Sequence, residues 1–258
     1  MSSALYVFGC SFSEDFKFFV ESEFDTHRKD YVLNYLNGQV PDSWPESLSK
    51  KLNKRLVNRA AVHGHYYGQN YREGNCNASI FNNICHICDD FKKGDIIIVE
   101  WTFIVRYKWA TEWAMLTVLP NQSPYNMDEK VSEEIIVNRY HKLWIDELFI
   151  MIKILNKLSE SIGFDIYYWT VDGTILSNKT EEIINDKRWL LSEQVNGKSY
   201  IDLVYDNGGM SIRHETNEKL IDDHLGVSGH NVLSDLFYNY INNNQRQTRF
   251  EDRTYSNF

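Results

Sequence analysis

A serine near the start of the chain stands where an α/β fold would expose a nucleophile. Ser11 follows the apolar run Leu5–Phe8 and precedes Glu14–Val20, which we expect to be helical. A serine between a strand and a helix presents its hydroxyl above the sheet edge, beside a helix N-terminus that favours negative charge. The same position suits Ser11 or Ser13 as the N-terminal cap of that helix, so the position alone leaves both roles open.

An acid and a histidine near the other end of the chain could activate such a serine. Asp222-Asp223-His224 is followed by Gly229-His230 and by a segment typical of a helix. A carboxylate two residues before a histidine can orient the imidazole as a general base. The chain has eight histidines, so this spacing carries weight only together with the serine.

Strands and helices alternate along the chain. The segment Asp95–Thr102 (DIIIVEWT) is apolar and rich in β-branched residues, as a central parallel strand should be. The alternation predicts a three-layer α/β/α sandwich with a central parallel sheet, whose functional residues lie at the C-terminal ends of the strands. We expect strands at Leu5–Phe8, Leu56–Ala61, Asp95–Thr102 and Phe164–Thr170, and helices at Trp44–Leu52, Ala78–Phe91, Asp128–Ile162, Thr180–Glu193 and Gly229–Ile241.

Composition limits the classes of function. The 258 residues include 27 Lys plus Arg against 36 Asp plus Glu, and this acidic balance argues against a general nucleic-acid binder. The most apolar stretch, Leu143–Leu155, contains three charged residues, so we expect no membrane span. Met1–Gly9 lacks the features of a signal peptide, and four cysteines are too few for a disulfide scaffold, so we expect a cytoplasmic protein.

Two short blocks carry a resemblance to a known family. Tyr6–Ser13 (YVFGCSFS) resembles the first block of the SGNH (GDSL-type) hydrolases, in the GCSF form found in bacterial and phage genomes. Asp222–His230 (DDHLGVSGH) resembles their last block. The resemblance spans residues 5 to 241 but is dense only in these blocks. It implies one flavodoxin-like domain over residues 1–241, followed by a polar tail at 242–258.

The family also implies a reaction and its residues. Ser11 would attack a carboxylic ester, such as an O-acetyl group on a glycan, with His224 as general base. Asp222, rather than Asp223, would orient the histidine, and Ser11 Oγ would lie within hydrogen-bonding reach of His224. His230 would lie on the first turn of the last helix. No metal or organic cofactor is required.

The resemblance also implies an oxyanion hole. The N–H of Ser11 would be one donor, and Gly74 the second, because Gly74 and Asn77 lead straight into a helix; Gly64 is the rival. The third block of the family, Gly-x-Asn-Asp, is replaced here by Glu100-Trp101-Thr102. The remaining donor would therefore be Asn77 or the hydroxyl of Thr102.

Three other features keep alternatives open. Arg106 could bind an anionic part of the substrate or pair with a carboxylate, and Trp101 could line a substrate groove or belong to the core. Cys85-His-Ile-Cys88 has metal-like spacing, with His63 and His65 as further ligands, but its place in a predicted helix favours core cysteines.

A second class of function is a binding or structural module with little or no turnover. The altered third block favours such a module. It could belong to a phage particle, and the tail at 242–258 would then serve a homo-oligomer or virion assembly.

Overall fold

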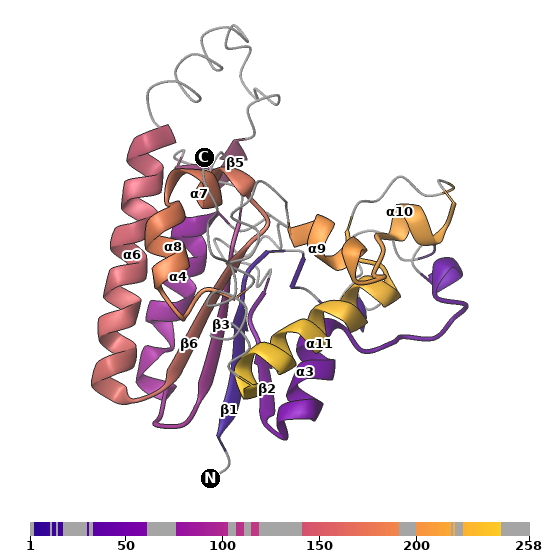
Figure 1. The fold of residues 1–258 in the computed structure, drawn as a ribbon, viewed down its shortest axis with the longest axis horizontal. Helices are drawn as coiled ribbons and strands as arrows, with labels where there is room; N and C mark the ends of the chain where they lie inside the picture. The colour runs from indigo at the N-terminus through magenta and orange to yellow at the C-terminus, as the bar shows by residue number, and fades with distance from the viewer. Residues whose placement is uncertain are drawn as a thin grey trace, which may run out of the picture.

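Four parallel strands form the central sheet of the protein (Figure 1). Their order is β2-β1-β3-β6, and β4 and β5 form a separate antiparallel pair. The computed structural model describes residues 3–10, 12–13, 15–17, 30, 33–60, 76–102, 107–110, 115–118, 141–190, 200–217, 219 and 224–243. The strands are β1 (Ala4–Phe8), β2 (Arg55–Asn58), β3 (Ile96–Trp101), β4 (Tyr107–Ala110), β5 (Met115–Val118) and β6 (Asp165–Thr170).

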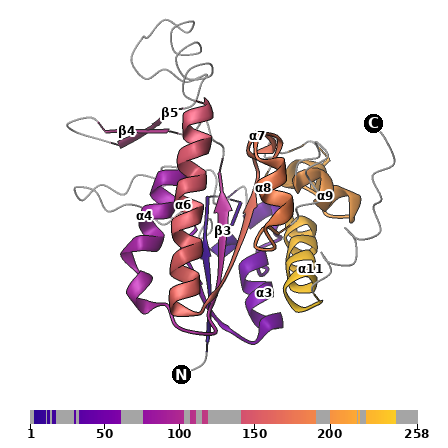
Figure 2. The same cartoon turned by 60° about the vertical axis from the view of Figure 1, so that its left-hand side comes forward.

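Helices cover both faces of the sheet (Figure 2). Helices α4 and α6 lie on one face, and α3 and α11 lie on the other. The predicted three-layer α/β/α arrangement with a central parallel sheet is therefore confirmed. Among the described helices, none is both long enough and apolar enough to cross a membrane. The helices are α3 (Trp44–Leu52), α4 (Asn77–His86), η1 (a 3-10 turn, Cys88–Asp90), α6 (His141–Ile162), α7 (Gly173–Asn178), α8 (Thr180–Asn185), α9 (Tyr200–Asp206), α10 (Ile212–Glu215) and α11 (Val227–Asn243).

Strand β1 occupies the point where the sheet reverses its order. It pairs with β2 on one side and with β3 on the other, with Leu5 opposite both Leu56 and Ile96. The chain therefore leaves β1 towards one edge of the sheet and later returns towards the opposite edge. In doubly wound sheets of this order, ligands bind outside the C-terminal ends of the two strands that flank the reversal. That rule places a site above the ends of β1 and β3.

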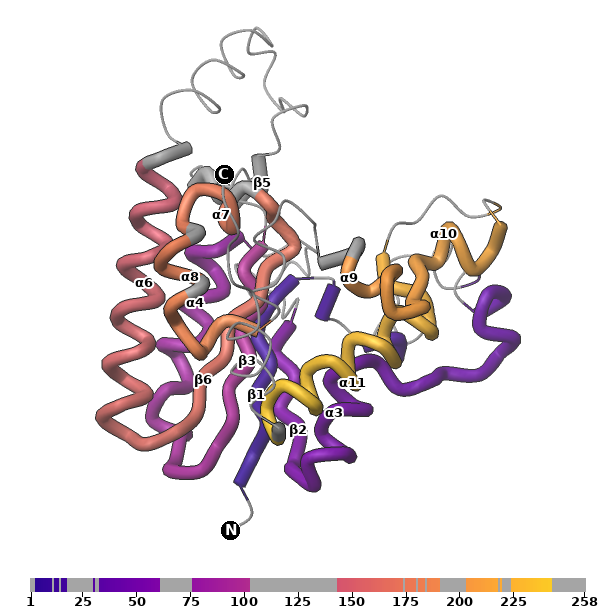
Figure 3. The backbone as a smooth tube through the Cα atoms, in the orientation of Figure 1, coloured from indigo at the N-terminus to yellow at the C-terminus, as the bar shows by residue number. Residues whose placement is uncertain are grey.

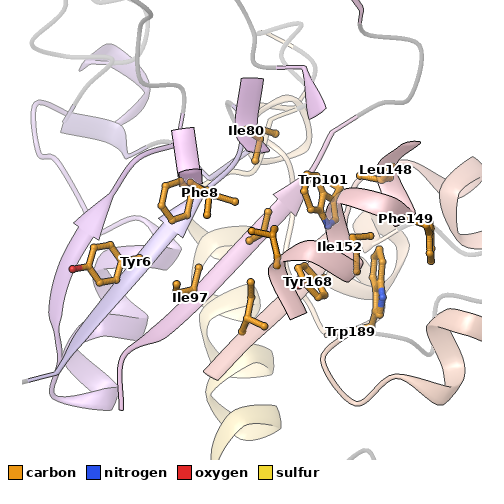
Figure 4. Packing of buried hydrophobic residues seen from close by; sticks show 14 of the residues in the cluster. Tyr6, Phe8, Ile80, Ile97, Trp101, Leu148, Phe149, Ile152, Tyr168 and Trp189 are labelled. Carbon is orange, nitrogen blue, oxygen red and sulfur yellow. The ribbon is translucent and has the colours of Figure 1, made fainter. Parts of the chain in front are cut away.

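The alternation of side chains along β1 divides the core into two clusters. Tyr6 and Phe8 face α4 and α6, while Leu5 and Val7 face α3 and α11. Figure 4 shows part of the first cluster, in which Phe8 is 1% exposed. Both faces of the central strands are buried, which is why their sequences are apolar throughout rather than alternating.

Several helix boundaries follow the signals in the sequence. Helix α3 begins next to Pro45, and the Glu46 carboxylate accepts the Ser43 N–H at 2.8 Å, which caps the first turn. Helix α6 ends before Gly163, whose φ of +88° suits a residue without a Cβ. The first part of the predicted helix, residues 128–140, lies outside the described residues.

The helix predicted over Thr180–Glu193 is wrong at residues 186–190, and residues 191–193 lie outside the described residues. The Tyr168 N–H donates to the Arg188 carbonyl at 2.7 Å, and the Leu190 N–H donates to the Tyr168 carbonyl at 2.6 Å. Trp189 thus forms an isolated parallel β-bridge with Tyr168 of β6, next to the sheet. Its indole is 1% exposed beside the Tyr168 ring, so burial of a large aromatic side chain overrides the local helix pattern.

The packing of α11 against the sheet yields a first prediction, on Phe237→Ala. Phe237 is fully buried, with its ring 4.9 Å from that of Trp44 and 5.5 Å from that of Trp169. Its truncation should lower the free energy of unfolding by about 3–5 kcal/mol in urea titrations. Ile150→Ala, at a position 56% exposed on α6, is the control and should change it by less than about 0.5 kcal/mol. Equal losses in the two variants would contradict this packing.

Candidate functional site

The turn after β1 lies at the predicted edge of the sheet. We call residues 9–13 the β1 turn; Ser11 itself lies outside the described residues, but both of its neighbours are described. The Ser13 N–H donates to the Cys10 carbonyl at 3.0 Å, which closes the turn. Cys10 and Ser13 are fully buried, and Phe12 is 8% exposed. The residues that flank the predicted nucleophile therefore have fixed, buried positions.

A buried carboxylate from the neighbouring strand binds the β1 turn. Glu100 of β3 is fully buried, and its Oε2 accepts the Cys10 N–H at 3.2 Å and the Ser13 hydroxyl at 2.5 Å. Its Oε1 accepts the Cys10 thiol at 2.7 Å. A carboxylate can be buried only where donors replace its water, and the described residues Cys10 and Ser13 supply such donors.

The close approach of Glu100 explains Gly9. A Cβ on Gly9 would lie 2.5 Å from Glu100 Oε2 and 2.7 Å from Glu100 Cβ. No side chain fits at such distances without displacing the carboxylate. Gly9 is not among the glycines with positive φ, so its backbone conformation does not require glycine. Lack of space for a Cβ does.

Two other elements hold the carbonyl groups of the β1 turn. The Asn58 amide, at the end of β2, donates to the Ser13 carbonyl at 3.0 Å. The Trp44 indole N–H of α3 donates to the Phe12 carbonyl at 3.1 Å. Elements from three parts of the sequence therefore meet around this turn.

His224 contacts the β1 turn although it belongs to the other end of the chain. Its ring centroid lies 4.8 Å from that of Phe12, with the planes tilted by 34°. The His224 carbonyl accepts the Ile212 N–H at 2.9 Å, and the Gly226 N–H donates to the Met210 carbonyl at 2.9 Å. This short antiparallel pairing fixes the backbone that carries the imidazole.

A second carboxylate fixes the chain directly after His224. Glu215 accepts the backbone N–H groups of Val227 and Ser228, at 3.2 and 2.7 Å, and the Ser228 hydroxyl at 2.5 Å. The Tyr35 hydroxyl also donates to this carboxylate. The negative charge at the start of α11 satisfies donors that a helix leaves unpaired and suits the positive end of the helix dipole.

His230 lies on the first turn of α11, as predicted, and has a structural role. Its Nδ1 accepts the Trp44 backbone N–H at 3.0 Å, and its ring packs on Phe16 with centroids 4.7 Å apart. Burial, with a smaller contribution from the nearby His224, lowers the pKa of His230 to about 3. His230 is therefore neutral, and because Nδ1 accepts, its proton lies on Nε2.

The Asn77 side chain, one of the two predicted side-chain donors, is hydrogen-bonded to the backbone of the other, Thr102. Asn77 begins α4, and its Oδ1 accepts the Thr102 N–H at 2.8 Å while its Nδ2 donates to the Thr102 carbonyl at 3.1 Å. Both residues are buried. The amide thus fixes the backbone that follows β3, and one of its two N–H donors is used in doing so.

Trp101 occupies the core rather than a groove. Its side chain is fully buried and stacks on Tyr168, with ring centroids 6.1 Å apart (Figure 4). It therefore presents no surface to a substrate.

Several predicted residues lie outside the described residues and so have no structural outcome here. They are Ser11, Gly64, Gly74, Arg106 and Asp222, together with Asp223, His63, His65 and the tail from residue 244.

The cysteine pair falls at the end of α4. Cys85 is exposed, and Cys88 in η1 is half-buried. Partial burial raises the pKa of the Cys85 thiol, and the neighbouring Cys88 adds to the rise. Within the described parts of the chain, no group of three or more His, Cys, Asp or Glu side chains could hold a metal ion.

No role was predicted from the sequence for Glu100, Cys10 or Asn58, and Ser13 was predicted only as a possible helix cap. A signal for Glu100 was present, because it is the charged residue within the apolar run Ile96–Trp101. A carboxylate at such a position must be paired in the interior. The donors that pair with it could not be named from the sequence.

The lack of space at Gly9 predicts the effect of Gly9→Ala. The added methyl group should displace Glu100 and lower the free energy of unfolding by about 1–3 kcal/mol, seen as a lower Tm. Gly173→Ala is the control, because a Cβ there meets nothing within 4 Å. A Gly9→Ala variant as stable as Gly173→Ala would show that Glu100 does not lie against the β1 turn.

The low pKa of His230 predicts an acid-dependent loss of stability. Between pH 6.5 and 3 the unfolded chain binds a proton at His230 that the folded protein does not, so stability falls as pH falls. The slope from this one group is up to about 1.4 kcal/mol per pH unit. His230→Asn keeps an acceptor for the Trp44 N–H and removes the titration.

Urea unfolding at pH 7.5 and pH 5 measures the difference. His230→Asn should lose about 2 kcal/mol less than the wild type over this interval. His86→Asn, at an exposed position of α4, is the matched control and should lose as much as the wild type. An unchanged pH dependence in His230→Asn would contradict a buried, neutral His230.

Comparison of the chain with protein-family models, with curated proteins and with solved structures finds no match. The case for a function therefore depends on the geometry of this chain.

Proposed function

We propose that this protein is a serine ester hydrolase of the SGNH type, with Ser11 as nucleophile and His224 as general base. The observation that carries the proposal is the contact between the His224 ring and Phe12, the residue after Ser11. It brings the two blocks of the resemblance together at the C-terminal edge of β1, where this sheet order places ligand sites.

The state of the second histidine supports the choice of His224. His230 is buried, and its Nδ1 is occupied by the Trp44 N–H. His224 is half-buried and contacts Phe12 in the β1 turn. A general base must exchange protons with substrate and solvent, so accessibility favours His224.

The proposed reaction has two steps. Ser11 Oγ attacks the ester carbonyl carbon as its proton passes to the imidazole of His224, and the imidazolium then protonates the departing alcohol. Water attacks the acyl-serine, gives its proton to His224, and releases the carboxylic acid as Ser11 recovers its proton. Asp222 would orient the imidazole and stabilise its charged form.

The oxyanion would be held by backbone donors. The N–H of Ser11 and that of Gly74 or Gly64 would bind it, and such donors act mainly in the transition state. Asn77 would contribute by fixing the Thr102 backbone at the end of β3. The substrate class we propose, from the resemblance, is a carboxylic ester such as an O-acetylated glycan.

A non-catalytic module with this fold is the second candidate. Glu100 favours it, because its buried carboxylate accepts the N–H of Cys10, the residue before Ser11. A buried negative charge also opposes an oxyanion nearby. Such a module would use the same edge for binding, within an oligomer or a virion.

Hydrolysis of p-nitrophenyl acetate and of acetylated glycans decides between the two. Ser11→Ala and His224→Asn should each lower kcat by about 10³-fold or more, because each removes a group that acts in the chemical step. Ser161→Ala and His86→Asn alter exposed residues of α6 and α4 and are the matched controls. Wild-type rates in Ser11→Ala would contradict the esterase. A wild type that hydrolyses none of these esters would favour the module.

A further inference from the structure

We propose that Glu100 is a positioning residue for the nucleophile: its carboxylate holds the β1 turn on both sides of Ser11. The consequence for catalysis rests on the proposed role of Ser11. The hold on the turn does not.

The contacts of Glu100 enclose the position of Ser11 in the sequence. Cys10, just before Ser11, gives its N–H and its thiol to the carboxylate, and Ser13, two residues after, gives its hydroxyl. Both oxygens are engaged. Glu100 lies on β3, a central strand paired on both sides, so the turn is tied to a rigid part of the sheet.

Donors and acceptors of the turn are divided between different partners. The donors of Cys10 and Ser13 go to Glu100, whereas the carbonyls of Phe12 and Ser13 accept from Trp44 and Asn58. Removal of the carboxylate would leave buried donors without this acceptor, and each such loss is costly. The turn would then move to satisfy them, and a displacement of about 1 Å at a reacting group can cost about 10² in rate.

The thiol of Cys10 offers a readout of the turn that needs no catalysis. Cys10 is fully buried and its thiol donates to Glu100, whereas Cys85 is exposed on α4. Alkylation of the native protein by iodoacetamide, followed by mass spectrometry of the two peptides, compares the cysteines in one sample. Glu100→Ala should speed alkylation of Cys10 about tenfold or more and leave Cys85 unchanged, because a freed turn exposes the thiol.

The same variants separate positioning from charge in hydrolysis of p-nitrophenyl acetate. Glu100→Ala should lower kcat about 10²-fold with KM within about twofold, as expected when alignment rather than binding is lost. Glu100→Gln keeps an oxygen for the Cys10 N–H and should restore kcat to within about tenfold of the wild type. Glu147→Ala, at an exposed position of α6, is the control and should change neither quantity.

The outcomes distinguish the two proposals. If Cys10 in Glu100→Ala is alkylated as slowly as in the wild type, the role of Glu100 is overturned whatever the activity. If the wild type is an active esterase and Glu100→Ala has the same kcat, the role of Glu100 is overturned as well. A wild type without esterase activity overturns the proposed function, while the alkylation still decides whether Glu100 holds the turn.

If Glu100→Ala does not fold, Ser13→Ala, which removes one donor to the carboxylate, takes its place. It should speed Cys10 alkylation severalfold, and an unchanged rate overturns the role of Glu100.

Discussion

The burial of the Glu100 carboxylate constrains the site more than any other described contact. An unpaired carboxylate in the interior would cost several kcal/mol, so the chain must bring donors to it. The β1 turn does this with the N–H and thiol of Cys10 and the hydroxyl of Ser13. Gly9 follows from the same requirement, because any larger residue would occupy the space of the carboxylate. One charge in a central strand thus accounts for three neighbouring residue types after β1.

The C-terminal helix brings the far end of the chain to this turn (Figure 3). Helix α11 packs beside α3 and over β1, and its Phe237 ring contacts those of Trp44 and Trp169, which also contact each other. Trp44 joins these layers to the site, since its backbone N–H binds His230 and its indole N–H binds the Phe12 carbonyl. The apolar packing of α11 and the polar contacts of the β1 turn are therefore parts of one arrangement. A loss of packing at Phe237 would also disturb the segment that carries His224.

Local patterns in the sequence were sufficient for most of the fold. The apolar run of β3, the proline at the start of α3 and the glycine after α6 each act over a few residues, and each predicted its element. Trp189 was misassigned because its position depends on a partner strand and on burial, which no local period encodes. The pairing of Asn77 with Thr102 was missed for the same reason, since it joins residues that only the fold brings together. Types of site residue can be proposed from a motif, but their partners depend on contacts between distant segments.

Two carboxylates from the middle and late parts of the chain hold the two halves of the proposed site. Glu100 satisfies the N–H of Cys10 before Ser11, and Glu215 satisfies the N–H groups of Val227 and Ser228 after His224. Neither needs to touch a substrate for this purpose. Each carboxylate binds backbone N–H groups that would otherwise be unpaired. Other conformations of the segments that carry the serine and the histidine would lose these hydrogen bonds and are therefore disfavoured. The described segments next to the proposed serine and histidine are thus positioned by acids that lie outside the proposed catalytic pair.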